Sequence, residues 1–376
     1  MNYQMPKPTS HRRDFLQGKA LQRSAADVKS INQINSMPEN DATSSGTPSY
    51  LLHISRKAMA CNFQIFLNAG EHELATEAAV EALDIVEEIE DILSIYRIHT
   101  SAAQLNQLGK AQAVHVDAIL LQLLKQSKEL WRRTNGAFDI TSTALSKLWG
   151  FHQKEHRVPA MTEIQESLKQ VGSQHLIIHD DGSVQFAQPE LQINLGSIGK
   201  GYALDRCHQH FVANNLTNYL IHGGLSSVLA KGHRQSETTQ DSGWQIGLRH
   251  PLIPEKYLAH LWLKNMAAGT SGDANQFFYH QGVRYGHVLD PRTGYPVEKV
   301  LSATAFSSTA AEADALATAF YVMGPEQSAE YCQQYDSGFL IVEQGKQNRA
   351  TRLHVMGLAD NQIELIDPSA KLIFYD

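Results

Sequence analysis

An α+β protein with mainly antiparallel sheets is the fold class that the sequence predicts. Strand and helix patterns are interleaved along the chain, which favours a mixed class. Hairpin signals outnumber clear strand–helix–strand crossovers, so antiparallel sheets are favoured over a doubly wound parallel sheet. With 376 residues, of which 42% are hydrophobic, the chain can bury a large core and is expected to be a soluble globular protein.

The first fifty residues differ in composition from the remainder, so we expect a flexible arm at 1–50 and one domain at 51–376. The arm is rich in Ser, Asn, Gln, Lys and Pro. Within it, Ser10–Leu16 resembles the start of a twin-arginine export signal. The next segment, Gln17–Ser30, is charged and lacks an apolar stretch, so a cytoplasmic location is favoured over export. We also expect no transmembrane segment.

The first half of the domain has clear strand, helix and hairpin patterns. Leu51–Leu67 has the character of a strand and is interrupted at Met59–Asn62. Glu73–Leu93 and Ile119–Thr134 carry apolar residues at a helical period and are predicted to be helices. A hairpin is predicted where Leu176–Ile178 and Val184–Phe186 flank an Asp-Asp-Gly turn.

The second half of the domain continues the alternation. Two helices are predicted, at Gly201–Asn214 and at Ala310–Met323. Strands are predicted at Tyr219–His222, Gln245–Leu248, Ala259–Leu263, Gly338–Val342 and Gln362–Ile366.

One loop concentrates residues that bear chemistry. The run from His287 to Pro296 contains an imidazole, the Asp290 carboxylate, two prolines and a glycine. Proline fixes its own φ and favours an extended residue before it, so His287 is expected at the end of a strand that enters a rigid loop. A neutral imidazole there can accept a proton, whereas an ion pair with Asp290 would make it structural. A surface turn with a solvated histidine is the simpler alternative.

A glycine-rich segment at Ile193–Gly201 favours phosphate binding. Glycines at the start of a helix expose backbone N–H groups, and Lys200 adds a positive charge. The segment does not match the Walker A pattern, and a structural turn explains it about equally well.

Asp314 and Thr318 are four residues apart inside an apolar helix pattern, so both oxygens lie on one helix face. Magnesium is commonly bound by one or two carboxylates together with ligand phosphates, which fits a site completed by a nucleotide. The alternative is an aspartate that bonds only to nearby backbone.

Two shorter clusters have both a structural and a binding interpretation. In Gly136–Thr141, Phe138 and Asp139 provide an aromatic wall and an acceptor for a flat heterocycle, or the segment starts a strand with a buried Phe. In Gly269–Asp273, the hydroxyls of Thr270 and Ser271 are able to meet a phosphate or a ribityl chain.

Charge and cysteine content exclude other classes. A net charge of −7 without a Lys/Arg block in the body argues against nucleic acid as a partner. The three cysteines, Cys61, Cys207 and Cys332, are far apart and indicate neither a disulfide framework nor a thiolate metal site.

In their order along Leu51–Asp367, these motifs resemble the FAD:protein FMN transferases, the ApbE family. The resemblance implies one α+β unit, related to the T-fold, with two related halves and antiparallel sheets. It implies Mg²⁺-dependent transfer of FMN from FAD to a Thr or Ser hydroxyl of an acceptor protein of an electron-transfer complex, with release of AMP. Hydrolysis of FAD to FMN and AMP, or flavin binding without catalysis, remain alternatives. The resemblance is carried by Met59-Ala60, Leu93–Tyr96, Gly136–Thr141, Leu195–Asp205, Gly223-Gly224, Thr270–Gly272, the His287 loop and Ala313–Thr318.

The resemblance also implies roles for individual residues. His287 matches the histidine that acts on the hydroxyl nucleophile. Metal ligation falls on Ser197, through its carbonyl, and on Asp314 and Thr318. The hydroxyls of Thr270 and Ser271 are further candidates for the cofactor site. Contacts with FAD are implied at Met59, Tyr96, Ala137, Phe138, Asp139, Asn194, Lys200 and Val288.

Two positions depart from the family pattern. Asn194 stands where the family usually has Asp, which removes a charge beside the nucleotide. Cys61-Asn62 stands where small or hydroxyl residues are more usual, so the pocket wall is expected to differ there.

Overall fold

The computed structural model describes residues 50–152, 155–235, 243–274, 276–344 and 351–376. The chain divides into two units, Met1–Thr47 and Pro48–Asp376. Residues 1–49 of the predicted arm, which include its twin-arginine-like motif, lie outside the described residues. All that follows concerns the second unit.

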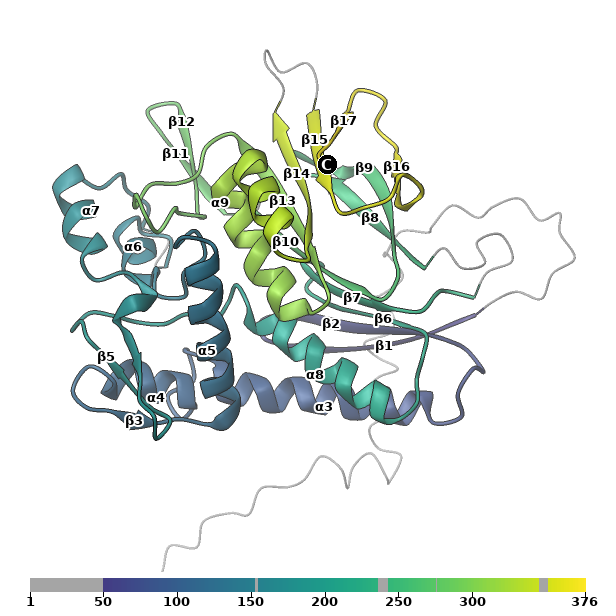
Figure 1. The fold of residues 1–376 in the computed structure, drawn as a ribbon, viewed down its shortest axis with the longest axis horizontal. Coiled ribbons are helices and arrows are strands. Elements are labelled where there is room, and N and C mark those ends of the chain that lie inside the picture. The colour runs from purple at the N-terminus through teal and green to yellow at the C-terminus, as the bar shows by residue number, and fades with distance from the viewer. Residues whose placement is uncertain (1–49, 153–154, 236–242, 275, 345–350) are drawn as a thin grey trace, which may run out of the picture. The chain divides into compact units, whose positions relative to one another are not determined.

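A nine-stranded sheet forms the centre of this unit (Figure 1). All neighbouring strands in it are antiparallel except β15 and β17, which confirms the predicted α+β class with antiparallel sheets. The strands lie in the order β1 (Leu51–Ala58), β2 (Cys61–Asn68), β6 (Tyr219–Gly223), β7 (Ser227–Lys231), β10 (Met266–Gly272), β13 (Val300–Ser307), β14 (Gly338–Gln344), β15 (Thr351–Met356) and β17 (Lys371–Phe374).

Three long helices pack on one face of the sheet: α3 (Ala75–Leu93), α8 (Gly199–Ala213) and α9 (Ala310–Gln334). A second sheet packs on the other face, with strands in the order β16 (Ile363–Leu365), β9 (Ile253–Leu263) and β8 (Trp244–His250). Alternate side chains of β14 serve the two layers: Phe339 and Ile341 face the helices, whereas Leu340 and Val342 face the second sheet. Burial on both sides therefore explains why Phe339–Val342 of this strand are all apolar.

The remaining elements lie beside these layers. Some of them enclose a small separate core, in which Trp149, Phe151, Ile164 and Leu289 are buried and against which Phe278 and Tyr285 pack. The elements are α4 (Ser101–Leu108), α5 (Ala118–Arg133), α6 (Thr143–Leu148), α7 (Met161–Leu168), the sheet β3 (Val114–His115), β5 (Ser183–Phe186) and β4 (Leu176–Ile178), the hairpin β11 (Phe277–His280) and β12 (Val283–Gly286), and the 3₁₀ turns Ser173–His175 and Asp360–Gln362.

The predicted helices and strands are present, with shifted ends. Helix α8 begins at Gly199, which places Lys200 in its first turn, and α9 continues beyond Met323 past a kink at Gly324. The interruption predicted after Ala58 is a tight turn, because Met59 and Ala60 both have positive φ and join β1 to β2. No helix in the described part of the chain is long and apolar enough to cross a membrane.

Candidate active site

A pocket of about 170 Å³ lies where three segments meet: the β1–β2 turn, the end of α3 and the start of α8. It brings together four of the predicted flavin contacts, Met59, Tyr96, Asn194 and Lys200. Its other lining residues are Ala60, Glu90, Leu93, Ser94, Ile95, Leu195, Gly196 and Gly199.

The start of α8 has the arrangement that an anion requires. The Asn194 side-chain oxygen accepts a hydrogen bond from the Gly196 N–H at 2.9 Å, which shapes the turn before the helix. The Lys200 ammonium donates to the Gly196 carbonyl at 3.3 Å and lines the pocket. The positive end of the helix dipole and the Lys200 charge therefore act on the same space. Ser197 lies in this turn and is partly buried.

Asp314 is buried in the first turns of α9 beside this helix end. Its Oδ2 accepts hydrogen bonds from the Gly201 N–H at 2.7 Å and from the Ser227 hydroxyl at 2.8 Å. Burial raises the pKa of Asp314 to about 6, while the Lys200 charge and these hydrogen bonds oppose the rise. Oδ1 receives no hydrogen bond from any residue that the structure describes, so it can serve as a metal ligand.

Two glycines allow the close packing that buries Asp314. A Cβ added at Gly201 would lie 2.0 Å from the Ala310 carbonyl oxygen, and one at Gly269 would lie 2.4 Å from that of Ala313. Helix α8 and strand β10 therefore approach the α9 backbone more closely than a side chain permits.

Asp205 fixes the beginning of α9. Its two carboxylate oxygens accept hydrogen bonds from the Ala310 and Ala311 N–H groups, at 2.7 and 2.9 Å. Burial raises the pKa of Asp205 to about 6. Asp205 belongs to the Leu195–Asp205 motif, but no role was predicted for it. The available signal was a carboxylate six residues after Gly199, where the glycine-rich helix begins.

Thr318 lies one helical turn after Asp314 on α9, as the i, i+4 spacing predicts. Its hydroxyl is 2.9 Å from that of Ser271, and the Thr270 hydroxyl is 2.9 Å from that of Thr304. Among the described residues there is no group of three or more His, Cys, Asp and Glu side chains suited to a metal. The metal site predicted at Asp314, Thr318 and the Ser197 carbonyl would contain one carboxylate, and it stays a prediction.

Ala137, Phe138 and Asp139 do not line the pocket. Ala137 and Phe138 are buried in the main core, and the segment forms turns instead of the strand that was one interpretation. The Asp139 carboxylate is buried and accepts four hydrogen bonds, from the N–H and hydroxyl groups of Thr141 and Ser173. Burial raises the pKa of Asp139. These bonds occupy both carboxylate oxygens, and the contact of Asp139 with a nucleotide stays a prediction.

His287 follows the last residue of β12, as predicted for a histidine at a strand end. Its backbone N–H and its Nδ1 lie 3.1 and 3.2 Å from the Gln276 carbonyl oxygen. Because a carbonyl only accepts, the neutral imidazole carries its proton on Nδ1 and leaves Nε2 as the acceptor. Burial lowers the pKa of His287, which favours this neutral form.

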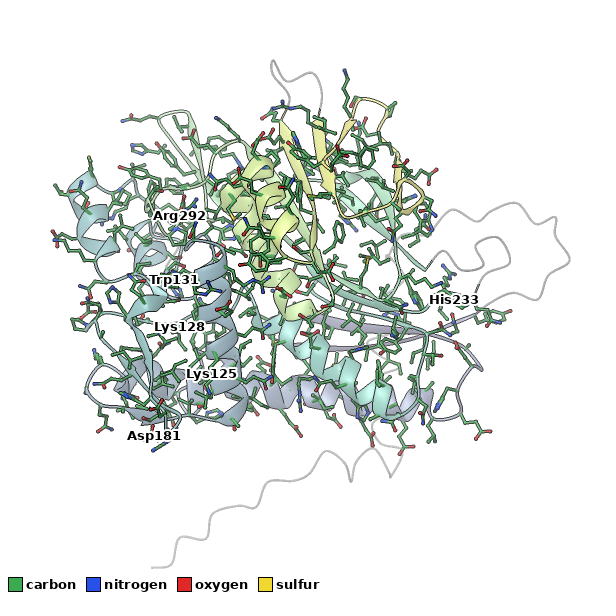
Figure 2. The ribbon with its side chains drawn as sticks, viewed as in Figure 1. Lys125, Lys128, Trp131, Asp181, His233 and Arg292 are labelled. Carbon is green, nitrogen blue, oxygen red and sulfur yellow. The ribbon has the colours of Figure 1, made fainter. Side chains whose placement is uncertain are left out.

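The loop after His287 is held by its own hydrogen bonds, and Asp290 does not pair with the histidine. The Asp290 carboxylate forms a two-pronged ion pair with Arg292 at 2.9 Å, so the alternative of a His287–Asp290 ion pair was wrong. The Gly294 carbonyl accepts from the Trp149 indole at 2.9 Å. A Cβ at Gly136 would lie within 3.6 Å of Trp131 and Arg292, so the loop meets the end of α5 (Figure 2).

The end of β10 connects the metal-ligand candidates to the histidine. The Ser271 hydroxyl contacts that of Thr318. Asp273, two residues after Ser271, carries a negative charge that partly opposes the lowering of the His287 pKa by burial. Val288, a predicted flavin contact, is partly buried, packs on the main core and accepts a hydrogen bond from the Val297 N–H at 3.0 Å. The candidate catalytic and metal-binding residues are therefore linked through one strand end.

Comparison with known proteins shows the family of the chain. The model of the ApbE family matches residues 59–341. An FAD:protein FMN transferase of Vibrio cholerae is 28% identical over 285 residues, which cover 74% of this chain and 84% of the relative. One of Treponema pallidum is 30% identical over 269 residues, covering 69% and 74%.

Solved structures are also similar. The crystal structure of the ApbE protein from Thermotoga maritima has a TM-score of 0.69 and 30% sequence identity, over 79% of this chain and 95% of that one. The apo form of the Pseudomonas stutzeri flavinyl transferase ApbE has a TM-score of 0.70 at 26% identity, over 81% and 95%.

Proposed function

The chain belongs to the ApbE family and is a flavin transferase, and we propose that it moves FMN from FAD to a Thr or Ser hydroxyl of an acceptor protein and releases AMP. One observation carries the proposal: the buried Asp314 carboxylate, whose Oδ1 receives no hydrogen bond from the described residues, lies against a cationic helix start that opens into the pocket. That combination suits a pyrophosphate and a divalent cation.

The pocket residues bind and orient FAD in this proposal. Lys200 and the positive end of the α8 dipole attract the pyrophosphate, and the hydroxyls of Thr270 and Ser271, outside the pocket lining, bind polar atoms of the same substrate. Tyr96, which is 75% exposed at the pocket wall, offers a ring face to a flat heterocycle. Met59, Asn194 and Val288 complete these contacts, and the contact of Ala137, Phe138 and Asp139 with the nucleotide is kept as part of the proposal.

Asp314, Thr318 and the Ser197 carbonyl would hold Mg²⁺. When bound, the cation neutralises negative charge on the pyrophosphate. The residues fit such an ion, because Asp314 keeps Oδ1 for it while Oδ2 is fixed by Gly201 and Ser227. Oxygen ligands of this kind are the ones that magnesium prefers.

His287 acts as general base. Its Nε2 takes the proton from the acceptor hydroxyl while Nδ1–H remains bonded to the Gln276 carbonyl. The hydroxyl oxygen forms a bond to the phosphorus on the FMN side, and the bond between that phosphorus and the bridging oxygen breaks. AMP leaves with the bridging oxygen, and FMN stays attached through a phosphoester. The acceptor we propose is a protein of an electron-transfer complex.

Mass spectrometry of a candidate acceptor tests the proposal. After incubation with FAD and Mg²⁺, transfer adds the mass of one FMN, less water, to a peptide that contains Thr or Ser. Free FMN and AMP with an unmodified acceptor would instead identify a hydrolase.

A further inference from the structure

Asp273 ends the Thr270–Ser271 motif and is used by no step described so far. It follows the last residue of β10 and is 4% exposed, so its carboxylate is almost fully withdrawn from water. Burying a carboxylate is unfavourable unless it is paired. Its partner is Arg284, from the hairpin strand β12.

The Arg284 guanidinium donates hydrogen bonds to two groups of Asp273. Nη1 donates to the Asp273 carboxylate and Nη2 donates to the Asp273 carbonyl at 3.0 Å. The same guanidinium lies over the Phe277 ring, 4.1 Å from its centroid. The contact therefore joins the end of β10 to both strands of the β11–β12 hairpin.

The carboxylate also defines where the hairpin ends. A Cβ added at Gly286 would lie 2.3 Å from Asp273 Oδ2 and 2.9 Å from Asp273 Cβ. Only a glycine therefore fits against Asp273 at this point. The next residue is His287, so the position of the imidazole depends on this contact.

The other side of the imidazole depends on the same residue. The Gln276 N–H donates to the Asp273 carbonyl at 3.3 Å, and the Gln276 carbonyl accepts from both the backbone N–H and Nδ1 of His287. Asp273 thus contacts the residue before His287 and the residue that fixes its Nδ1 proton.

We propose that Asp273 and Arg284 are a positioning pair, which holds Gln276 and Gly286 so that His287 keeps its proton on Nδ1 and presents Nε2 to the acceptor hydroxyl. Neither residue touches the reacting atoms. The proposal rests on the proposed role of His287 as general base. It adds the structural device that orients that base, in the way that outer hydrogen-bond partners orient functional histidines.

The test compares Asp273→Asn, Arg284→Gln and the double variant with the wild-type protein. Nitrogen-15 NMR of labelled histidine reports the His287 tautomer in the protein alone, with assignment from the His287→Ala spectrum. Transfer kinetics report kcat and the KM for FAD. We expect His287 in each single variant to be a mixture of the Nδ1–H and Nε2–H tautomers. We also expect kcat to fall by about 10- to 100-fold. KM should stay within about twofold, and the double variant should equal the singles, because the pair acts as a unit.

Glu343→Gln is the matched control, because it breaks another partly buried ion pair, Glu343–Arg352 at 3.0 Å, between β14 and β15. It should lower stability without changing the tautomer or kcat. If Asp273→Asn does not fold, Arg284→Lys replaces it in the test. Lysine keeps the positive charge but cannot bond to the carboxylate and the carbonyl of Asp273 with two separate nitrogens.

The proposal is overturned if the pair variants keep the wild-type tautomer, or if they lose kcat only in proportion to stability, as the control does. If the wild-type protein transfers no FMN, the proposed function fails, yet the tautomer measurement still decides whether the pair positions His287.

Discussion

Replacing Gly201 by Ala tests whether close contact between α8 and α9 builds the Asp314 site. The new Cβ would lie 2.0 Å from the Ala310 carbonyl oxygen and 2.7 Å from the Ala311 nitrogen, and both are backbone atoms that a rotamer change cannot move. Overpacking of this kind costs about 1–3 kcal/mol, and a contact this short belongs at the upper end. Alanine regains about 1 kcal/mol of helix propensity. We therefore expect a net loss of about 2 kcal/mol in the free energy of unfolding.

Gly199→Ala is the control, two residues earlier in the same helix. Its Cβ would meet only Leu93 and Leu195 side chains, at 3.6 and 4.0 Å, which are ordinary contacts. We expect this variant to stay within about 1 kcal/mol of the wild-type stability. Urea denaturation measures the free energy of unfolding of both alanine variants and of the wild type. Equal stability of the two alanine variants would refute the argument that backbone contact between α8 and α9 requires glycine.

Three further perturbations test separate parts of the account. Asp314→Ala should abolish Mg²⁺-dependent FMN transfer while the circular dichroism spectrum stays native, and full activity in Mg²⁺ would place the metal elsewhere. Tyr96→Ala should weaken FAD binding in calorimetry by about 1 kcal/mol without loss of stability; Ile98→Ala, at a residue that is 88% exposed and outside the pocket wall, should leave affinity unchanged. Burial raises the pKa of Asp205 in the folded protein to about 6, above its ordinary value of 3.8. The protonated form therefore favours folding, and this contribution to stability is present below pH 4 and is lost as the pH rises to 6. Asp205→Asn should reduce that decline in urea titrations at pH 4, 5 and 6, and an unchanged decline would remove Asp205 as its source.

Local sequence patterns predicted the parts of the site in which all residues belong to a single helix, strand or loop. Asp314 and Thr318 share a helix, so their spacing alone places both oxygens on one face. The position of His287 after a strand followed from Pro291 and the turn residues beyond it. The helix start at Lys200 followed from its glycines.

Contacts between distant segments were beyond such patterns. The pocket joins residues near 60, 95 and 197, and only the resemblance to a family associated them. The pairing of Asp273 with Arg284 depends on a hairpin that had no strong turn signal in the sequence. The bonds between Asp139 and Ser173 were not predicted for a related reason, because the two residues are 34 positions apart in the sequence.

The FMN transfer rate of His287→Ala, measured beside its FAD affinity, tests the central claim most directly. Nε2 of His287 is the proposed proton acceptor, and an acceptor hydroxyl is a poor nucleophile while it keeps its proton. We predict that transfer, followed by mass spectrometry of the acceptor, slows by about 10²- to 10⁴-fold while FAD affinity in calorimetry stays near that of the wild type. Transfer at the wild-type rate would contradict the account, and a parallel loss of FAD affinity and thermal stability would assign His287 a structural role.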